Sequence, residues 1–192
     1  MSTYETHRPL RTLAPPRKRL VIMGVSGCGK TSLADGLGVA LGWDVLDADH
    51  LHPATNVEKM RQGIPLQDAD RWPWLDAVAT SLAAPLGASD GRVMACSALK
   101  RVYRETIRRG CPGTHFVFLE GTFEAVLPRL QARAGHYMPA SLLQTQFATL
   151  ECPGTDEQDV STLPLTWPVA ELVATVTSLI GLPCQAAPLN QE

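Results

Sequence analysis

A glycine-rich run near the N-terminus has the residue types and spacing of a phosphate-binding loop. It fits G-x-x-x-x-G-K-[ST] in full, after a short apolar run and at the start of a helical pattern, as the motif requires. Glycines let backbone N–H groups point inward at phosphate oxygens, and the helix N-terminus adds partial positive charge. The Lys30 ammonium suits the β- and γ-phosphates of a nucleoside triphosphate, and the Thr31 hydroxyl suits Mg²⁺. The predicted nucleotide-binding residues are Gly24, Val25, Ser26, Gly27, Cys28, Gly29, Lys30 and Thr31.

Two carboxylates, Asp47 and Asp49, follow the second apolar run of the chain. Parallel α/β sheets bind ligands at the carboxyl ends of their strands. One carboxylate there can hold water on Mg²⁺, and the other can accept a proton from an attacking hydroxyl. The alternative is an Asp-rich turn that caps the next helix. Glu120 also ends an apolar run, but we interpret it as an exposed residue at the end of a buried strand.

Basic side chains recur at helical spacing in two places. Lys100, Arg104 and Arg108 lie at i, i+4 and i+8 and so share one helix face, where Arg108 is interpreted as solvated. Arg129 and Arg133 form a second pair at i and i+4, for which a solvated basic edge is the alternative to a catalytic role. Pro128 should kink or shorten that helix.

Short apolar runs alternate with longer helical patterns, which predicts a parallel α/β sheet. The 192 residues suffice for one compact domain, expected at 17–192, while 1–16 is polar and is expected to be a disordered tail. The expected strands are 20–23, 43–46, 93–96, 115–119 and 160–163, and the expected helices are 30–41, one within 71–86, 99–109, around 124–134, 141–150 and 169–180.

Composition excludes several classes of function. No apolar run is long enough to span a membrane, and the N-terminus lacks the apolar core of a secretory signal. The net charge is −2 and five cations lie before residue 20, so the folded part is mildly acidic, which argues against nucleic-acid binding. Five widely spaced cysteines without a C-x-x-C pair favour free thiols in a reducing cytoplasm.

Five blocks of sequence together resemble the gluconokinase family, from about residue 20 to the C-terminal helix. The acidic-turn block separates it from shikimate and adenylate kinases, which share the phosphate loop but not that block. The blocks are Met23-Gly24-Val25-Ser26-Gly27, the run from Asp49-His50-Leu51-His52-Pro53 to Arg71-Trp72-Pro73-Trp74-Leu75, Cys96-Ser97-Ala98-Leu99-Lys100-Arg101-Val102-Tyr103-Arg104, Arg133-Ala134-Gly135-His136, and Gln146-Phe147 with Leu150-Glu151.

The resemblance implies a P-loop NTPase fold: a five-stranded parallel sheet in the order 2-3-1-4-5, helices on both faces, and a mobile lid within about 123–140. It further implies ATP- and Mg²⁺-dependent phosphorylation of gluconate at its 6-hydroxyl, in a cytoplasmic enzyme that is often a homodimer.

The resemblance also suggests roles for single residues. Asp49 is expected to act as base with Asp47 on the metal side, although the two roles can be reversed. Lys30 and the lid arginines are expected to stabilise the transferred phosphoryl group. The expected catalytic residues are Lys30, Asp49, Arg129 and Arg133; the expected substrate residues are Asp49, His52, Asn56, Lys59, Lys100 and Arg104; the expected metal residues are Thr31 and Asp47.

Two rival functions stay open at this stage: a kinase of the same class with another acceptor, and an ATP-binding regulator that hydrolyses ATP slowly. The thiol of Cys28 also has two interpretations. The helix N-terminus and Lys30 would stabilise a reactive thiolate, whereas a thiol that points away from the phosphates would be inert.

Overall fold

The computed structural model describes residues 18–132 and 140–181. Its centre is a five-stranded, fully parallel sheet in the order β2-β3-β1-β4-β5, which confirms the predicted fold. The predicted tail 1–16, Arg133 and much of the predicted lid lie outside the described residues. The strands are β1 Arg19–Met23, β2 Asp44–Asp47, β3 Arg92–Ala95, β4 His115–Glu120 and β5 Val160–Pro164.

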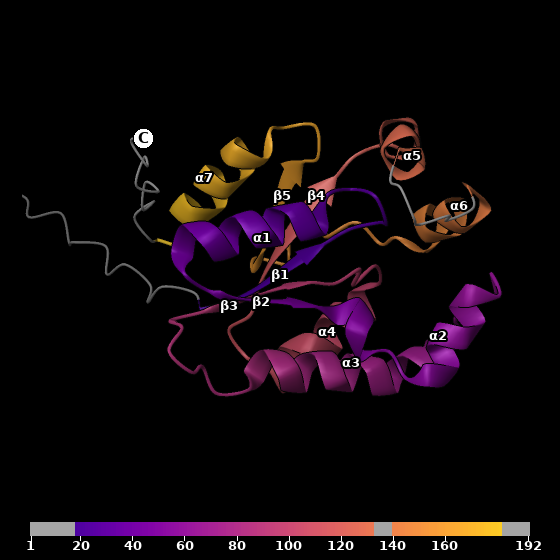
Figure 1. Ribbon diagram of the computed structural model, residues 1–192, viewed down its shortest axis with the longest axis horizontal. Helices are drawn as coiled ribbons and strands as arrows, with labels where there is room; N and C mark the ends of the chain where they lie inside the picture. Colours follow the sequence, from indigo (N-terminus) through magenta and orange to yellow (C-terminus); the bar gives the residue numbers. More distant parts are fainter. Residues whose placement is uncertain (1–17, 133–139, 182–192) are drawn as a thin grey trace, which may run out of the picture.

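Helices cover both faces of the sheet (Figure 1). On one face lie α1 (Lys30–Leu41) and α7 (Val169–Leu179), and on the other lie α3 (Asp68–Ala83) and α4 (Arg101–Gly110). The remaining elements gather towards one end of the domain. They are the 3-10 helix η1 Ala48–Leu51, α2 Ala54–Arg61, α5 Phe123–Gln131 and α6 Ala140–Thr149.

The alternation of side chains along β1 divides the core into two layers. Leu20 and Ile22 pack among the residues on the α1 and α7 side, whereas Val21 and Met23 pack with α3 and α4. All four side chains are fully buried. A central parallel strand therefore reads as a continuous apolar run, because helices cover both of its faces.

The expected elements are confirmed, with boundaries that shift by up to three residues. Helix α1 ends at Gly42 in the left-handed conformation, as the glycine predicted. Helix α5 includes Pro128 and ends at Gln131, so the proline falls in its last turn. Helix α2 was not predicted from periodicity. Within the described ranges, no helix combines the length and apolarity needed to cross a membrane.

Candidate active site

The loops after β1, β2 and β3 emerge at one edge of the sheet, since these strands are parallel neighbours. They are the phosphate loop (24–31), the acidic turn (47–52) and a segment that we call the acceptor loop (97–100). Pairing of Ala95 with both Ile22 and Asp47 places the three strand ends level. The N–H of Gly24 donates to the carbonyl oxygen of Ser97 at 3.2 Å, which joins the phosphate loop to the acceptor loop.

The backbone of the phosphate loop has the form that an anion requires. Gly24, Gly27 and Gly29 all have positive φ angles, of 138°, 82° and 103°, a region that side chains disfavour. Helix α1 starts directly after Gly29 and has no side-chain cap, so its first N–H groups are open to a phosphate. The Lys30 ammonium donates to the Val25 carbonyl at 2.9 Å. These features fit the phosphates of ATP.

Both cysteines near the site are buried. Burial raises the pKa of Cys28 despite the nearby Lys30, which favours the inert interpretation of its thiol. Burial likewise raises the pKa of Cys96 to about 12. The charges of Asp47 and Asp49 add to this rise, and that of Lys30 opposes it.

Gln146 of α6 contacts the phosphate loop directly. The Ser26 N–H donates to its Oε1 at 2.7 Å, and its Nε2 donates to Ser26 Oγ at 3.1 Å. No role was predicted for Gln146, although it lies in a block that resembles the family. A contact between residues 120 positions apart has no periodicity that would reveal it.

The acidic turn is fixed by its own backbone and by α3. Asp47 caps η1, with its Oδ1 accepting the Asp49 N–H at 2.9 Å, so the capping alternative holds for Asp47. Trp74 donates its indole N–H to the Ala48 carbonyl at 2.7 Å, and its ring stacks on His52 at 4.3 Å. Burial lowers the pKa of His52, against the opposing effect of Asp49. The Asp49 side chain remains exposed.

Two residues predicted to bind substrate join α2 to α3. Asn56 is buried and donates its amide to the Asp70 carbonyl at 2.7 Å, which gives it a structural role rather than the expected substrate contact. Lys59 pairs with the Asp70 carboxylate at 2.6 Å and remains half exposed. This ion pair lowers the pKa of Asp70.

Lys100 lies in a cluster that sequence reasoning missed. Its ammonium binds both oxygens of Asp68, at 2.7 and 2.8 Å, and Asp68 also accepts the Tyr103 hydroxyl at 2.5 Å. Arg71 donates to the same hydroxyl at 2.9 Å and lies over the Tyr103 ring. Hydrogen bonds from Lys100 and Tyr103 lower the pKa of Asp68. Two cations and two hydrogen-bonding groups thus meet beside the acceptor loop.

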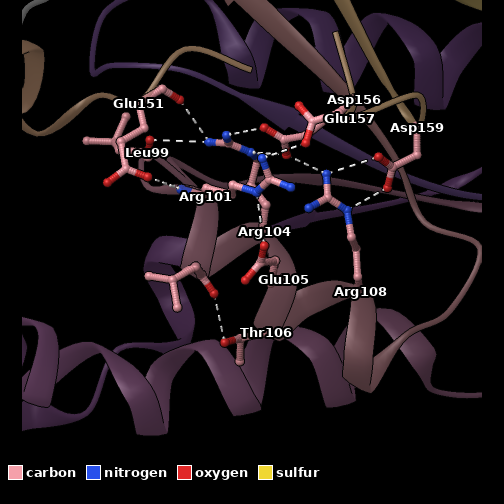
Figure 2. A network of polar contacts seen from close by, with 11 residues as sticks. Leu99, Arg101, Arg104, Glu105, Thr106, Arg108, Glu151, Asp156, Glu157 and Asp159 are labelled. Carbon is pink, nitrogen blue, oxygen red and sulfur yellow. Dashed lines mark hydrogen bonds and ion pairs between the residues drawn. The ribbon is translucent and has the colours of Figure 1, made fainter. Parts of the chain in front are cut away.

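Arg104 requires a correction. It was expected to bind substrate oxygens, but its side chain is 0% exposed and pairs with Glu157, whose side chain is 2% exposed (Figure 2). Arg108 also differs from its interpretation as solvated, because it pairs with Glu157 and Asp159, at 2.6 Å each. The predicted shared face holds for Arg104 and Arg108, which both reach Glu157 in the loop before β5. It does not hold for Lys100, which precedes α4 and pairs with Asp68 of α3.

The predicted lid arginines are only partly described. Arg129 lies near the end of α5 and donates to the Leu165 carbonyl at 2.9 Å, and its charge acts on Cys28 in the phosphate loop. Arg133 lies outside the described residues. Within the described ranges, no group of three or more His, Cys, Asp or Glu side chains is placed to hold a metal.

The sheet order and the phosphate loop define a P-loop kinase. A shikimate kinase from Bacteroides thetaiotaomicron shares this fold, with a TM-score of 0.62 at 16% identity over 85% of this chain and 98% of that chain. The gluconokinase of Gluconobacter oxydans is 50% identical over 157 residues, 82% of this chain and 85% of the relative. The structure of a gluconokinase from Sinorhizobium meliloti is 42% identical, covers 87% of this chain and 93% of that chain, and has a TM-score of 0.77. No protein-family model matches the sequence. The chain belongs to the gluconokinase family.

Proposed function

We propose that this protein transfers the γ-phosphoryl group of ATP to the 6-hydroxyl of gluconate, giving 6-phosphogluconate and ADP. The observation that carries the proposal is the meeting of three loops at one sheet edge: a phosphate loop, a turn with two carboxylates, and an acceptor loop with Lys100. Gluconate has a carboxylate at one end and the reacting hydroxyl at the other. A site for it needs cations and a base at separate places, and this edge supplies both.

At the phosphoryl end, the Lys30 ammonium stabilises charge on the transferred group. Asp49, whose side chain is exposed, accepts the proton of the attacking hydroxyl. Asp47 and the Thr31 hydroxyl would hold Mg²⁺, which would neutralise phosphate charge. Asp47 keeps one oxygen for this role, because the other is bound to the Asp49 N–H. Arg129 and Arg133 are proposed to stabilise the transferred phosphoryl group, as the family resemblance implies.

At the acceptor end, His52, Lys59 and Lys100 bind the hydroxyls and carboxylate of gluconate. Arg71 joins this set, since its guanidinium lies beside Lys100 and Tyr103. Arg104 and Asn56 are not included, because both are buried and hydrogen-bonded within the domain. We further propose a cytoplasmic homodimer, in keeping with the family resemblance.

A coupled assay with Mg-ATP and gluconate, reading formation of 6-phosphogluconate, tests the function. Gluconate should be phosphorylated far faster than shikimate or AMP. Equal or faster turnover of either competitor would overturn the substrate assignment. Slow ATP hydrolysis that no acceptor stimulates would instead support a nucleotide-binding regulator.

A further inference from the structure

We propose that Arg104 is a positioning residue, which holds the acceptor loop in register with the phosphate loop. The inference rests on the proposed function, because it assigns to this buried side chain a part in binding the acceptor. In the described part of the chain, no hydrogen bond or ion pair joins the Arg104 side chain to the phosphate loop or to a side chain proposed to bind gluconate. It acts on the backbone that carries Lys100.

The guanidinium of Arg104 has two sets of partners (Figure 2). Nε and Nη2 bind the two oxygens of Glu157, at 2.8 and 2.6 Å. Nη1 donates to the carbonyls of Ala98 and Leu99, at 3.3 Å each, and to that of Glu151 at 3.1 Å. The ion pair fixes the plane of the guanidinium, so Nη1 reaches the acceptor loop from a fixed point.

Stability alone is a weak reason for this arrangement. Burying an ion pair costs desolvation free energy that apolar side chains of similar volume would avoid. An apolar pair at 104 and 157 would fill the same space, yet it would remove the Arg104 donor from the carbonyls of Ala98 and Glu151 and leave the Leu99 carbonyl with only the Glu151 N–H. What the arginine provides, and an apolar side chain could not, is hydrogen-bond donors for the backbone carbonyls of the acceptor loop.

The acceptor loop needs such support, because its conformation is strained. Ala98 has a φ of 42°, the one positive φ of a non-glycine residue in the described ranges. That conformation persists only where its surroundings enforce it. On one side of Ala98, the Ser97 carbonyl accepts the Gly24 N–H of the phosphate loop, and on the other side Lys100 carries the proposed substrate cation.

Glu151 holds the same loop from the end of α6. Its backbone N–H donates to the Leu99 carbonyl at 2.9 Å, and its carboxylate accepts the Arg101 N–H at 2.7 Å, at the start of α4. Arg104 also donates to the Glu151 carbonyl, so Arg104 and Glu151 bind the acceptor loop and each other. A shift of these contacts would move Lys100, whereas none of the Arg104 and Glu151 contacts with the acceptor loop involves a phosphate-loop residue.

The primary test is Arg104→Lys, which keeps the charge but loses the planar fork. We expect kcat/KM for gluconate to fall about 10- to 100-fold, since a misplacement of about 1 Å has effects of that size. The KM for ATP should stay within about twofold, because no nucleotide contact is lost. Arg108→Gln is the matched control: it removes another arginine from Glu157 but touches no acceptor-loop carbonyl. It should lower the melting temperature and leave both KM values unchanged.

A second variant covers the case in which Arg104→Lys does not fold. Arg104→Met combined with Glu157→Leu removes both buried charges and fills their space, so the domain should fold, with the acceptor loop unsupported. The same loss for gluconate is expected. If either variant folds and has the kcat/KM of the wild type for gluconate, the inference is wrong. It is also wrong if kcat/KM falls equally for ATP and for gluconate.

The dependence on Lys100 gives an independent test. If Arg104 acts by placing Lys100, then Arg104→Lys should add little to the loss already caused by Lys100→Met. Fully additive losses would refute this route. The wild type separates this inference from the proposed function: if it does not phosphorylate gluconate, the function fails, whereas wild-type activity with unaffected Arg104 variants refutes the positioning role alone.

Discussion

Gln146 and Ser26 are joined by two hydrogen bonds that connect α6 to the phosphate loop. The Ser26 N–H donates to the carboxamide oxygen at 2.7 Å, and the carboxamide nitrogen donates to the hydroxyl at 3.1 Å. Five residues later, Glu151 binds the acceptor loop. One short stretch of chain therefore contacts both the phosphate loop and the acceptor loop.

Replacing Gln146 with Ala should destabilise the domain by about 1–2 kcal/mol, because two partly buried hydrogen bonds are lost and the Ser26 N–H loses its partner. Urea unfolding of the nucleotide-free protein measures this. Gln144→Ala is the control, since Gln144 is an exposed residue of the same helix, and its effect should be within about 0.5 kcal/mol. Equal stabilities for the two variants would mean that the contact contributes nothing.

Lys30→Ala should abolish most phosphoryl transfer without unfolding the protein. A loss of about 2–4 kcal/mol in transition-state stabilisation is expected for a preorganised charge in such a site. Steady-state kinetics gives the loss, and circular dichroism checks the fold. Lys18→Ala is the control for the loss of a lysine, because the Lys18 ammonium lies on the surface, 3.9 Å from the Asp90 carboxylate. Near-normal activity of Lys30→Ala would remove the phosphate loop from the mechanism.

The two acidic-turn carboxylates can be separated by amide substitution. Asp49→Asn should lower kcat at least about tenfold with little change in the ATP KM, because only the acceptor hydroxyl loses its base. Asp47→Asn retains a capping side chain for η1 and should instead shift the Mg²⁺ dependence. Kinetics over a range of Mg²⁺ concentrations distinguishes them, and the opposite pattern would exchange the two roles.

Glu157 should make the fold sensitive to acid. Its hydrogen bonds with Arg104 lower its pKa from 4.5 to about 2. A carboxylate with a lowered pKa stabilises the fold above its ordinary pKa, and this stabilisation is lost as the pH falls towards the lowered value. Urea unfolding should therefore show a loss of roughly 3 kcal/mol between about pH 5 and pH 2 from this group.

The matched variant for the acid series is Glu157→Gln, which cannot titrate. Its free energy of unfolding should be lower than that of the wild type at neutral pH. The difference between the two should become smaller as the pH falls. Glu171→Gln, at an exposed position of α7, is the control. If the difference in free energy of unfolding stays constant down to pH 2, protonation of Glu157 is not what destabilises the fold.

Thiol reagents should modify Cys152 before Cys28 or Cys96 in the folded protein. Cys152 is exposed, whereas burial raises the pKa of the other two thiols. Brief alkylation at neutral pH followed by peptide mapping tests the order. Cys28→Ser should be inactivated as fast as the wild type. If Cys28 is labelled rapidly and Mg-ATP prevents this, the Cys28 thiol is reactive, contrary to the prediction.

The sequence predicted the sheet and the phosphate loop well, because each is encoded locally. Leu20 to Met23 are apolar since both faces of β1 are covered, and the glycines of the loop have spacing that few other structures require. Arg104 was misplaced for the opposite reason. Helical spacing gives the face of α4 on which it lies, but not that Glu157, 53 residues later, covers that face.

The same limit explains the acceptor site. Lys59 and Lys100 were identified as available cations, and their partners Asp70 and Asp68 were not, because ion pairs between separate elements leave no periodic pattern. Asn56 was expected to face substrate, yet its amide serves the start of α3. Residue type and spacing predict what chemistry a side chain can do, while burial decides whether it is free to do it.

The Lys100–Asp68 pair makes acceptor binding an exchange of counter-ions. A gluconate carboxylate that reached Lys100 would displace Asp68, which already binds both its oxygens to the ammonium. The free energy gained would then be the difference between two similar ion pairs, so added salt should weaken gluconate binding less than it weakens the attraction of an anion to an unpaired lysine. The hydroxyls of the sugar acid, rather than its charge, would be left to set most of the affinity.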